Sequence, residues 1–275
     1  MARLPGQQIE FHAPRAQAAI DLIGGARRSA RQRKQLFQIS HVESAHAPVK
    51  DRAAALELGK PGQRFSQRVL AIGRFLVGRG CTHLVVACNT ATAAAATALR
   101  RALPGIPVIG IEPGVKPAAA SSNNGHIAVL ATESTARSER LARLIRDHAR
   151  NTRVDVLPCP GWATKVETLQ LDDAEFAEAA RRHLAPALEA GADRIVLGCT
   201  HYAFLAPILA PIVAGRALLV DVADAVARQC ERLTGNPTGG TGRLELLATA
   251  HPERLGAALP ALGLGDLQPR LDGPA

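Results

Sequence analysis

Short apolar runs alternate with longer helical segments along most of this chain, and this alternation is what most restricts its fold. Residues 84–87 form a fully apolar run, as is typical of strands buried in parallel sheets, and the Ala-rich residues 91–102 that follow favour a helix. The other runs that we interpret as strands are 107–111, 127–130, 154–157, 194–197 and 218–221. The other segments that we interpret as helices are 66–79, 137–150, 173–190, the residues after 201, and 252–262. This order predicts βαβ units, and therefore an α/β fold with parallel sheets flanked by helices.

The length of the chain and the spacing of its cysteines further restrict the class of protein. A chain of 275 residues is long enough for two domains, each with its own core. No segment approaches about 20 consecutive apolar residues, so we expect no membrane-spanning helix, and the first residues lack the apolar run of a secretory signal. Five widely spaced cysteines without a CxxC pair fit neither a disulfide framework nor a zinc site. We therefore expect no metal and a location in the reducing cytoplasm.

The formal net charge of +9 is concentrated at one end of the chain. Residues 1–79 hold 14 Lys/Arg and 5 Asp/Glu, whereas residues 80–275 hold 19 of each. The densest part, 27–34, could attract nucleic-acid phosphates, but no aromatic residues lie between its arginines to stack on bases. A solvated, partly disordered segment is the simpler interpretation. We therefore do not expect nucleic-acid binding, and residues 1–40 are atypical for the α/β pattern.

Two cysteines occupy matching places 111 residues apart. Cys88 and Cys199 each follow an apolar run and precede small polar residues that open a helix. The carboxyl ends of parallel strands form the ligand-binding edge of an α/β sheet, and a helix N-terminus favours thiolate over thiol. If the two halves face each other, two thiols approach one substrate carbon from opposite sides. This arrangement predicts inversion of a stereocentre, with one thiolate removing a proton and the other thiol returning one.

Several motifs around these cysteines resemble those of the glutamate racemase family, within the aspartate/glutamate racemase superfamily. The resemblance runs from about residue 41 to 233. The segments that carry it are Val85-Val86-Ala87-Cys88-Asn89-Thr90, Pro107-Val108-Ile109-Gly110-Ile111-Glu112-Pro113-Gly114 and Leu197-Gly198-Cys199-Thr200-His201-Tyr202. It implies two similar α/β domains with the active site in the cleft between them. The implied first domain consists of residues 1–113 together with 222–275, and the implied second domain consists of residues 114–221. Within the first domain, residues 1–40 are atypical, and one interpretation of them is that they are disordered.

The resemblance also implies roles for individual residues. Cys88 and Cys199 match the two catalytic cysteines, and no cofactor is implied. The implied catalytic helpers are His201, Glu167 and Asp21, although a solvated glutamate is an equally good interpretation of Glu167 from the sequence. The implied substrate-binding residues are Asn89, Thr90, Thr200, His201, Val49 and Lys50. The other cysteines, Cys81, Cys159 and Cys230, match no catalytic position, and we interpret them as packing residues.

The N-terminal part departs from the family pattern. The Asp-Ser-Gly motif that begins the family is absent, and Asp21 before 22–25 is its only remnant. Pro-Tyr-Gly appears here as Pro48-Val49-Lys50, which loses a hydroxyl and a flexible backbone position. Loss of one acid–base helper typically costs about 10²–10⁴ in rate. The departures fall on the half of the site that belongs to the first domain.

The resulting expectation is a cofactor-independent racemase that converts L- to D-glutamate for peptidoglycan synthesis with Cys88 and Cys199 as its bases. Its partner is the small-molecule substrate, no membrane is involved, and a homodimer is compatible with the resemblance. Two alternatives stay open. One is a catalytically impaired relative that acts by binding through its basic N-terminal segment, and the other is a related racemase with a different substrate.

Overall fold

The computed structural model describes residues 35–39, 61–171, 174–234, 245–247, 252–262 and 270–272. The chain forms two compact units, one of residues 1–32 with 236–275 and the other of 33–235. In the first unit, β8 (Glu245–Leu247) and β9 (Arg270–Asp272) pair in parallel, and α11 spans Pro252–Ala261. The second unit contains two larger parallel sheets, which carry all the candidate site residues that the structure describes.

The first of these sheets has three parallel strands in the order β1-β2-β3. Their bounds are Gln35–Ile39, Cys81–Val86 and Val108–Gly110. Helices α2 (Pro61–Gly78) and α3 (Asn89–Ala102) pack together so closely that a Cβ added at Gly73 would lie 2.5 Å from Leu99 Cδ1. Helix α10 (Ala223–Thr234) also packs on this sheet, because Cys230 shares a buried cluster with Val85, Ala87 and Ile109.

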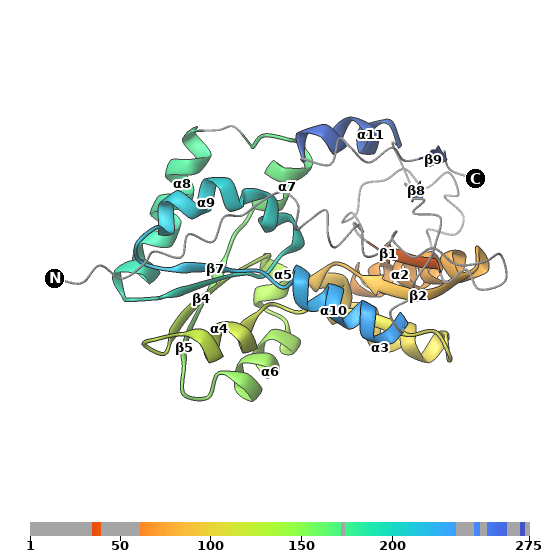
Figure 1. Ribbon diagram of the computed structural model, residues 1–275, viewed down its shortest axis with the longest axis horizontal. Coiled ribbons are helices and arrows are strands. Elements are labelled where there is room, and N and C mark those ends of the chain that lie inside the picture. The colour runs from red at the N-terminus through yellow and green to blue at the C-terminus, as the bar shows by residue number, and fades with distance from the viewer. Residues whose placement is uncertain are drawn as a thin grey trace. The chain divides into compact units, whose positions relative to one another are not determined.

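The second sheet has four parallel strands in the order β5-β4-β6-β7. Their bounds in that order are Arg153–Pro158, His126–Ala131, Arg194–Leu197 and Leu218–Val220. Helices α4 (Val115–Ser121) and α6 (Glu139–His148) contribute to one core with Val129 and Val196, and α8 (Ala174–Glu189) and α9 (Ala206–Val213) lie on the opposite side of the strands (Figure 1). Every residue of β4 and β6 is buried, because helices cover both faces.

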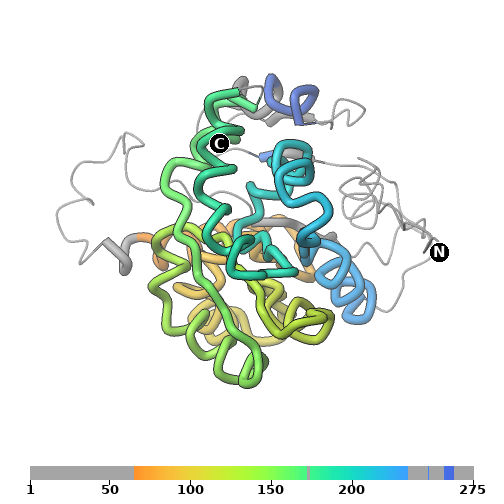
Figure 2. The backbone as a smooth tube through the Cα atoms, turned by 90° about the vertical axis from the view of Figure 1, so that its left-hand side faces the viewer, coloured from red at the N-terminus to blue at the C-terminus, as the bar shows by residue number. Residues whose placement is uncertain are grey.

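Three short elements follow strands of this sheet at their carboxyl ends. Helix α5 (Glu133–Ala136) follows β4, helix α7 (Trp162–Glu167) follows β5, and the 3₁₀ helix η1 (Thr200–Leu205) follows β6. Figure 2 traces the backbone in chain order, from orange α2 through the green segments to blue α10. No helix among the described residues combines the length and apolar character needed to cross a membrane.

The α/β class with parallel sheets is confirmed, and the strand predicted at 194–197 has the observed bounds. Strand β1 was not predicted, because it lies within residues 1–40, which were considered atypical for the α/β pattern. The helix predicted over 137–150 is confirmed as α6, although it begins two residues later because Ser138 is its N-cap, and it ends at His148. The short elements α7, β8 and β9 were not predicted. The domain limits at 113 and 221 stay a prediction.

Candidate active site

Cys88 lies directly beyond β2, at the N-terminus of α3. Its backbone is extended (φ −148°, ψ 124°), and its Sγ accepts a hydrogen bond from the Ala91 N–H at 3.4 Å. An extended residue whose side chain accepts from the first turn is the usual geometry of an N-cap, here with sulfur in place of oxygen. Of the five cysteines, all with free thiols, Cys88 is the one that is partly exposed. The fold therefore presents this thiol at the carboxyl end of the first sheet.

Cys199 occupies the corresponding place in the second sheet, between β6 and η1. Its backbone is also extended (φ −138°, ψ 138°), so the two cysteines share strand-end geometry as well as sequence context. The Cys199 Sγ lies 3.5 Å from His201 Nδ1, and His201 Nε2 lies 3.5 Å from Glu167 Oε1. When Nε2–H donates to Glu167, Nδ1 carries the lone pair that can accept the thiol proton. The structure thus brings together three of the predicted catalytic residues.

The expectation that helix N-termini leave these thiols with lowered pKa values is wrong, because burial outweighs the backbone N–H groups. Burial raises the pKa of Cys199 to about 12 and also raises the pKa of Cys88, since a thiolate loses hydration in this environment. Backbone N–H groups of His201 and Ala91 lower the respective values, but by less than burial raises them. Negative charge on Cys88 also contributes to the raised pKa of Cys199.

Three threonine hydroxyls meet beside Cys88. Thr90 Oγ1 lies 3.1 Å from Thr135 Oγ1 and 3.3 Å from Thr132 Oγ1, and the latter two are 3.1 Å apart. Thr90 comes from α3, whereas Thr132 and Thr135 come from the β4–α5 segment of the second sheet. The carboxyl ends of β2 and β4 therefore converge at this hydroxyl cluster.

Thr132 and Thr135 were not among the predicted site residues. The signal that could have found them is their position within five residues of the end of the apolar run 127–130, because the carboxyl ends of parallel strands lie at the same edge of the sheet. Thr132 accepts from the Thr135 N–H at 3.2 Å, the contact of a threonine N-cap.

The remaining predicted site residues fall into two groups. Asn89 is buried, with 5% of its surface exposed, and Thr200 is half-buried at the start of η1. Asp21, Val49 and Lys50 lie outside the described residues. Within the described part of the chain, no group of three or more His, Cys, Asp or Glu side chains could hold a metal ion.

Two parallel sheets each end in a cysteine that begins a helix, and one of these cysteines, Cys199, is backed by a His–Glu pair. This arrangement defines a protein suited to cysteine acid–base chemistry at a carbon atom. The chain belongs to the Asp/Glu/Hydantoin racemase family, whose model matches residues 12–230. The resemblance inferred from the motifs is thereby confirmed.

Individual relatives agree with this assignment. The chain is 39% identical over 224 residues to a glutamate racemase of Pseudomonas paraeruginosa, covering 80% of this chain and 82% of the relative. It is 40% identical over 235 residues to a glutamate racemase of Ralstonia nicotianae, covering 84% and 82%. Among solved structures, a glutamate racemase isoform of Bacillus anthracis superposes with a TM-score of 0.69 at 25% identity, covering 91% of this chain and 90% of that one.

Proposed function

We propose that this protein racemises glutamate without a cofactor and so supplies D-glutamate for peptidoglycan. The observation that carries the proposal is the matched pair of strand-end cysteines, Cys88 and Cys199, each of which lies at the start of a helix with an extended backbone. The relatives of similar length are glutamate racemases. Reduced cysteines of this kind suit the cytoplasm, where we place the enzyme.

The reaction needs one base and one acid on opposite faces of the α-carbon. One cysteine thiolate takes the α-proton, and the electron pair of the broken C–H bond delocalises into the adjacent carboxylate. The other cysteine thiol then gives its proton to the opposite face, which forms the new C–H bond and leaves a thiolate there. In the reverse direction the two cysteines exchange roles.

The raised thiol pKa values mean that the base must be generated when substrate arrives. On the Cys199 side, His201 Nδ1 can take the thiol proton while Glu167 stabilises the imidazolium that results. On the Cys88 side, the Thr90 hydroxyl lowers the thiol pKa by hydrogen bonding. The ammonium group of glutamate would favour thiolate at either cysteine once it enters this poorly hydrated site.

The polar groups around the cysteines suit a dicarboxylate substrate. Hydroxyls of Thr90 and Thr200 can donate to carboxylate oxygens, as can the amide of Asn89. Thr132 and Thr135 extend this set, because their hydroxyls already contact Thr90. We propose that the threonine cluster binds one carboxylate.

The test is incubation of the purified protein with L-glutamate, and separately with D-glutamate, in D₂O. Inversion is followed by circular dichroism and α-proton exchange by NMR. Exchange with inversion from both enantiomers supports the proposal. Cys88→Ser and Cys199→Ser should each nearly abolish inversion, and inversion retained by both variants, or no reaction by folded wild-type protein, would overturn it.

A further inference from the structure

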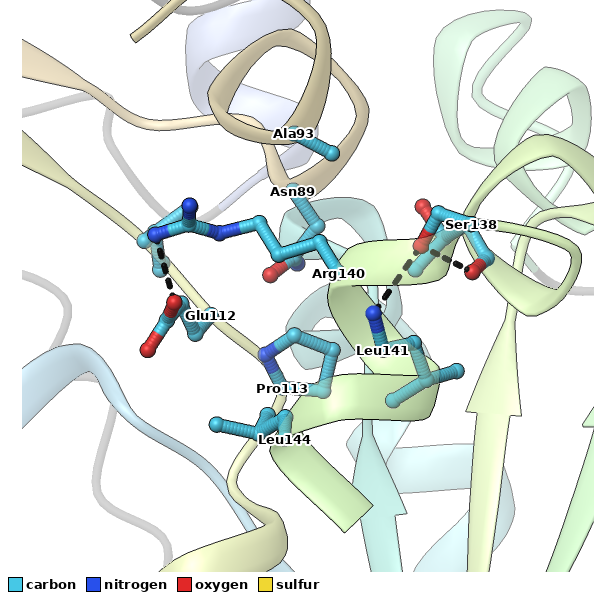
Figure 3. Close-up of a pocket in the computed structure, with 10 residues that line it drawn as sticks. Asn89, Ala93, Glu112, Pro113, Ser138, Arg140, Leu141 and Leu144 are labelled. Carbon is cyan, nitrogen blue, oxygen red and sulfur yellow. Dashed lines mark hydrogen bonds and ion pairs between the residues drawn. The ribbon is translucent and has the colours of Figure 1, made fainter. Parts of the chain in front are cut away.

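Arg140 connects helix α6 to the segment between β3 and α4, and neither of these takes part in the proposed proton transfers. Its side chain extends from α6 across a small hollow lined by Asn89, Glu112, Pro113 and other residues, with α3 on one side and Pro113 on the other (Figure 3). Arg140 Nη2 lies 2.5 Å from Glu112 Oε1. Glu112 belongs to the connection between β3 and α4, which leads from the first sheet to the second. The ion pair, whose side chains are 36% and 40% exposed, therefore links α6 to this connection.

Two buried polar atoms in the hollow have no hydrogen-bond partner among the described residues. They are Asn89 Oδ1, an acceptor, and Arg140 Nε, whose hydrogen is a donor. Leaving a buried polar group unsatisfied is costly, and native proteins commonly satisfy such groups with a buried water that makes about three hydrogen bonds. The space between the lining side chains is about the size of one water molecule. A water there can donate to Asn89 and accept from Arg140.

Asn89 is the residue next to Cys88 and the first residue of α3. We propose that Arg140 is a positioning residue for Cys88, holding Glu112 directly and the Asn89 amide through one bridging water. This rests on the proposed function, since it says how one of the two acid–base cysteines is held for proton transfer. A shift of about 1 Å in such a group can cost on the order of a hundredfold in rate.

The same helix offers a matched control. Arg146 pairs with Glu139 at 2.6 Å, and both side chains are more than half exposed. Exposed pairs of this kind contribute little to stability. Arg146→Met therefore removes the same charge from α6 without touching Asn89 or Glu112, whereas Arg140→Met removes both contacts and keeps an apolar stem.

The first measurement is independent of catalysis. Iodoacetamide alkylation of Cys88 is followed by peptide mass spectrometry in folded wild-type, Arg140→Met and Arg146→Met proteins. Release of the α3 N-terminus should make Cys88 react about threefold faster or more in Arg140→Met, with Arg146→Met like wild type. Equal rates in all three proteins would overturn the proposal, even if wild-type protein proved inactive on glutamate.

The second measurement asks whether the effect is confined to one cysteine. In Arg140→Met, kcat should fall about tenfold. The primary isotope effect with α-deuterated glutamate should rise for the enantiomer that Cys88 deprotonates, identified with the Cys88→Ser variant, and not for the other. Equal changes for both enantiomers would show a merely structural role and overturn the proposal.

Arg140→Lys separates the two contacts of the guanidinium. Lysine can keep the pair with Glu112 but has no Nε–H at the position that faces Asn89. The one-sided isotope effect should therefore persist in Arg140→Lys. Full restoration of wild-type values by lysine would overturn the water-mediated link.

Discussion

Gly198 lies against the backbone of Leu130 immediately before Cys199. The Gly198 N–H donates to the Leu130 carbonyl oxygen at 2.8 Å, and a Cβ at position 198 would lie 2.5 Å from that same oxygen. The close contact is with backbone of the neighbouring strand, so it cannot be relieved by a side-chain rotation. Glycine at this position lets β6 approach β4 closely enough to fix the place of the Cys199 sulfur.

Gly198→Ala should therefore displace Cys199 and destabilise the fold. Forcing an extra carbon into a well-packed site costs about 1–3 kcal/mol, and a shift of the catalytic group lowers the rate further. The measurements are the free energy of unfolding in urea and the kcat for racemisation. Gly215→Ala is a contrasting variant, because nothing lies within 4 Å of a Cβ added at that position. Its φ of +74° disfavours alanine, so this variant should lower stability more than it lowers turnover. Unchanged kcat in Gly198→Ala would contradict this account.

The hydroxyl cluster predicts an effect on substrate affinity. Thr135→Val keeps the shape of a side chain that is 3% exposed but removes the hydroxyl that contacts Thr90 and Thr132. We expect KM for glutamate to rise about tenfold, since a hydrogen bond to a charged group contributes about 1.5–3 kcal/mol. Thr135→Ser retains the hydroxyl and should stay close to wild type. If valine and serine variants have the same KM, the cluster does not bind the carboxylate.

The His201–Glu167 pair predicts a one-sided catalytic defect. His201→Asn should lower kcat by about 10²–10⁴, because the acceptor for the Cys199 proton is lost. Glu167→Gln should have a smaller effect, since its contact with His201 is 3.5 Å and partly exposed. In both variants the primary isotope effect should rise for the enantiomer that Cys199 deprotonates. A rise confined to the other enantiomer would show that the pair does not serve Cys199.

The sequence predicts those features that depend on local patterns. Apolar runs locate the central strands, and the position of a cysteine directly after such a run places Cys88 and Cys199 at the sheet edge. Strand β1 could not be found in this way, because Gln35 and Gln38 interrupt its apolar residues beside a basic segment. The contacts of Thr135 with Thr90, and of Arg140 with Glu112, depend on how distant elements pack. The direction of the thiol pKa shifts also needed the structure, since it is set by burial.

The buried thiol of Cys159 predicts loss of stability at alkaline pH. Burial raises its pKa to about 12, and only 2% of its surface is exposed. In the unfolded state this thiol ionises near pH 8.5. Above that pH, ionisation stabilises the unfolded state, whereas the buried thiol of the folded state stays protonated. The stabilisation is complete below about pH 8.5 and is lost as the pH rises toward 12, at about 1.4 kcal/mol per pH unit. Cys159→Ser, which has no group that titrates in this range, should remove this part of the pH dependence. Urea unfolding of both proteins at pH 7.5 and 10 is the measurement, and wild-type stability that falls no more than that of the serine variant would contradict the prediction.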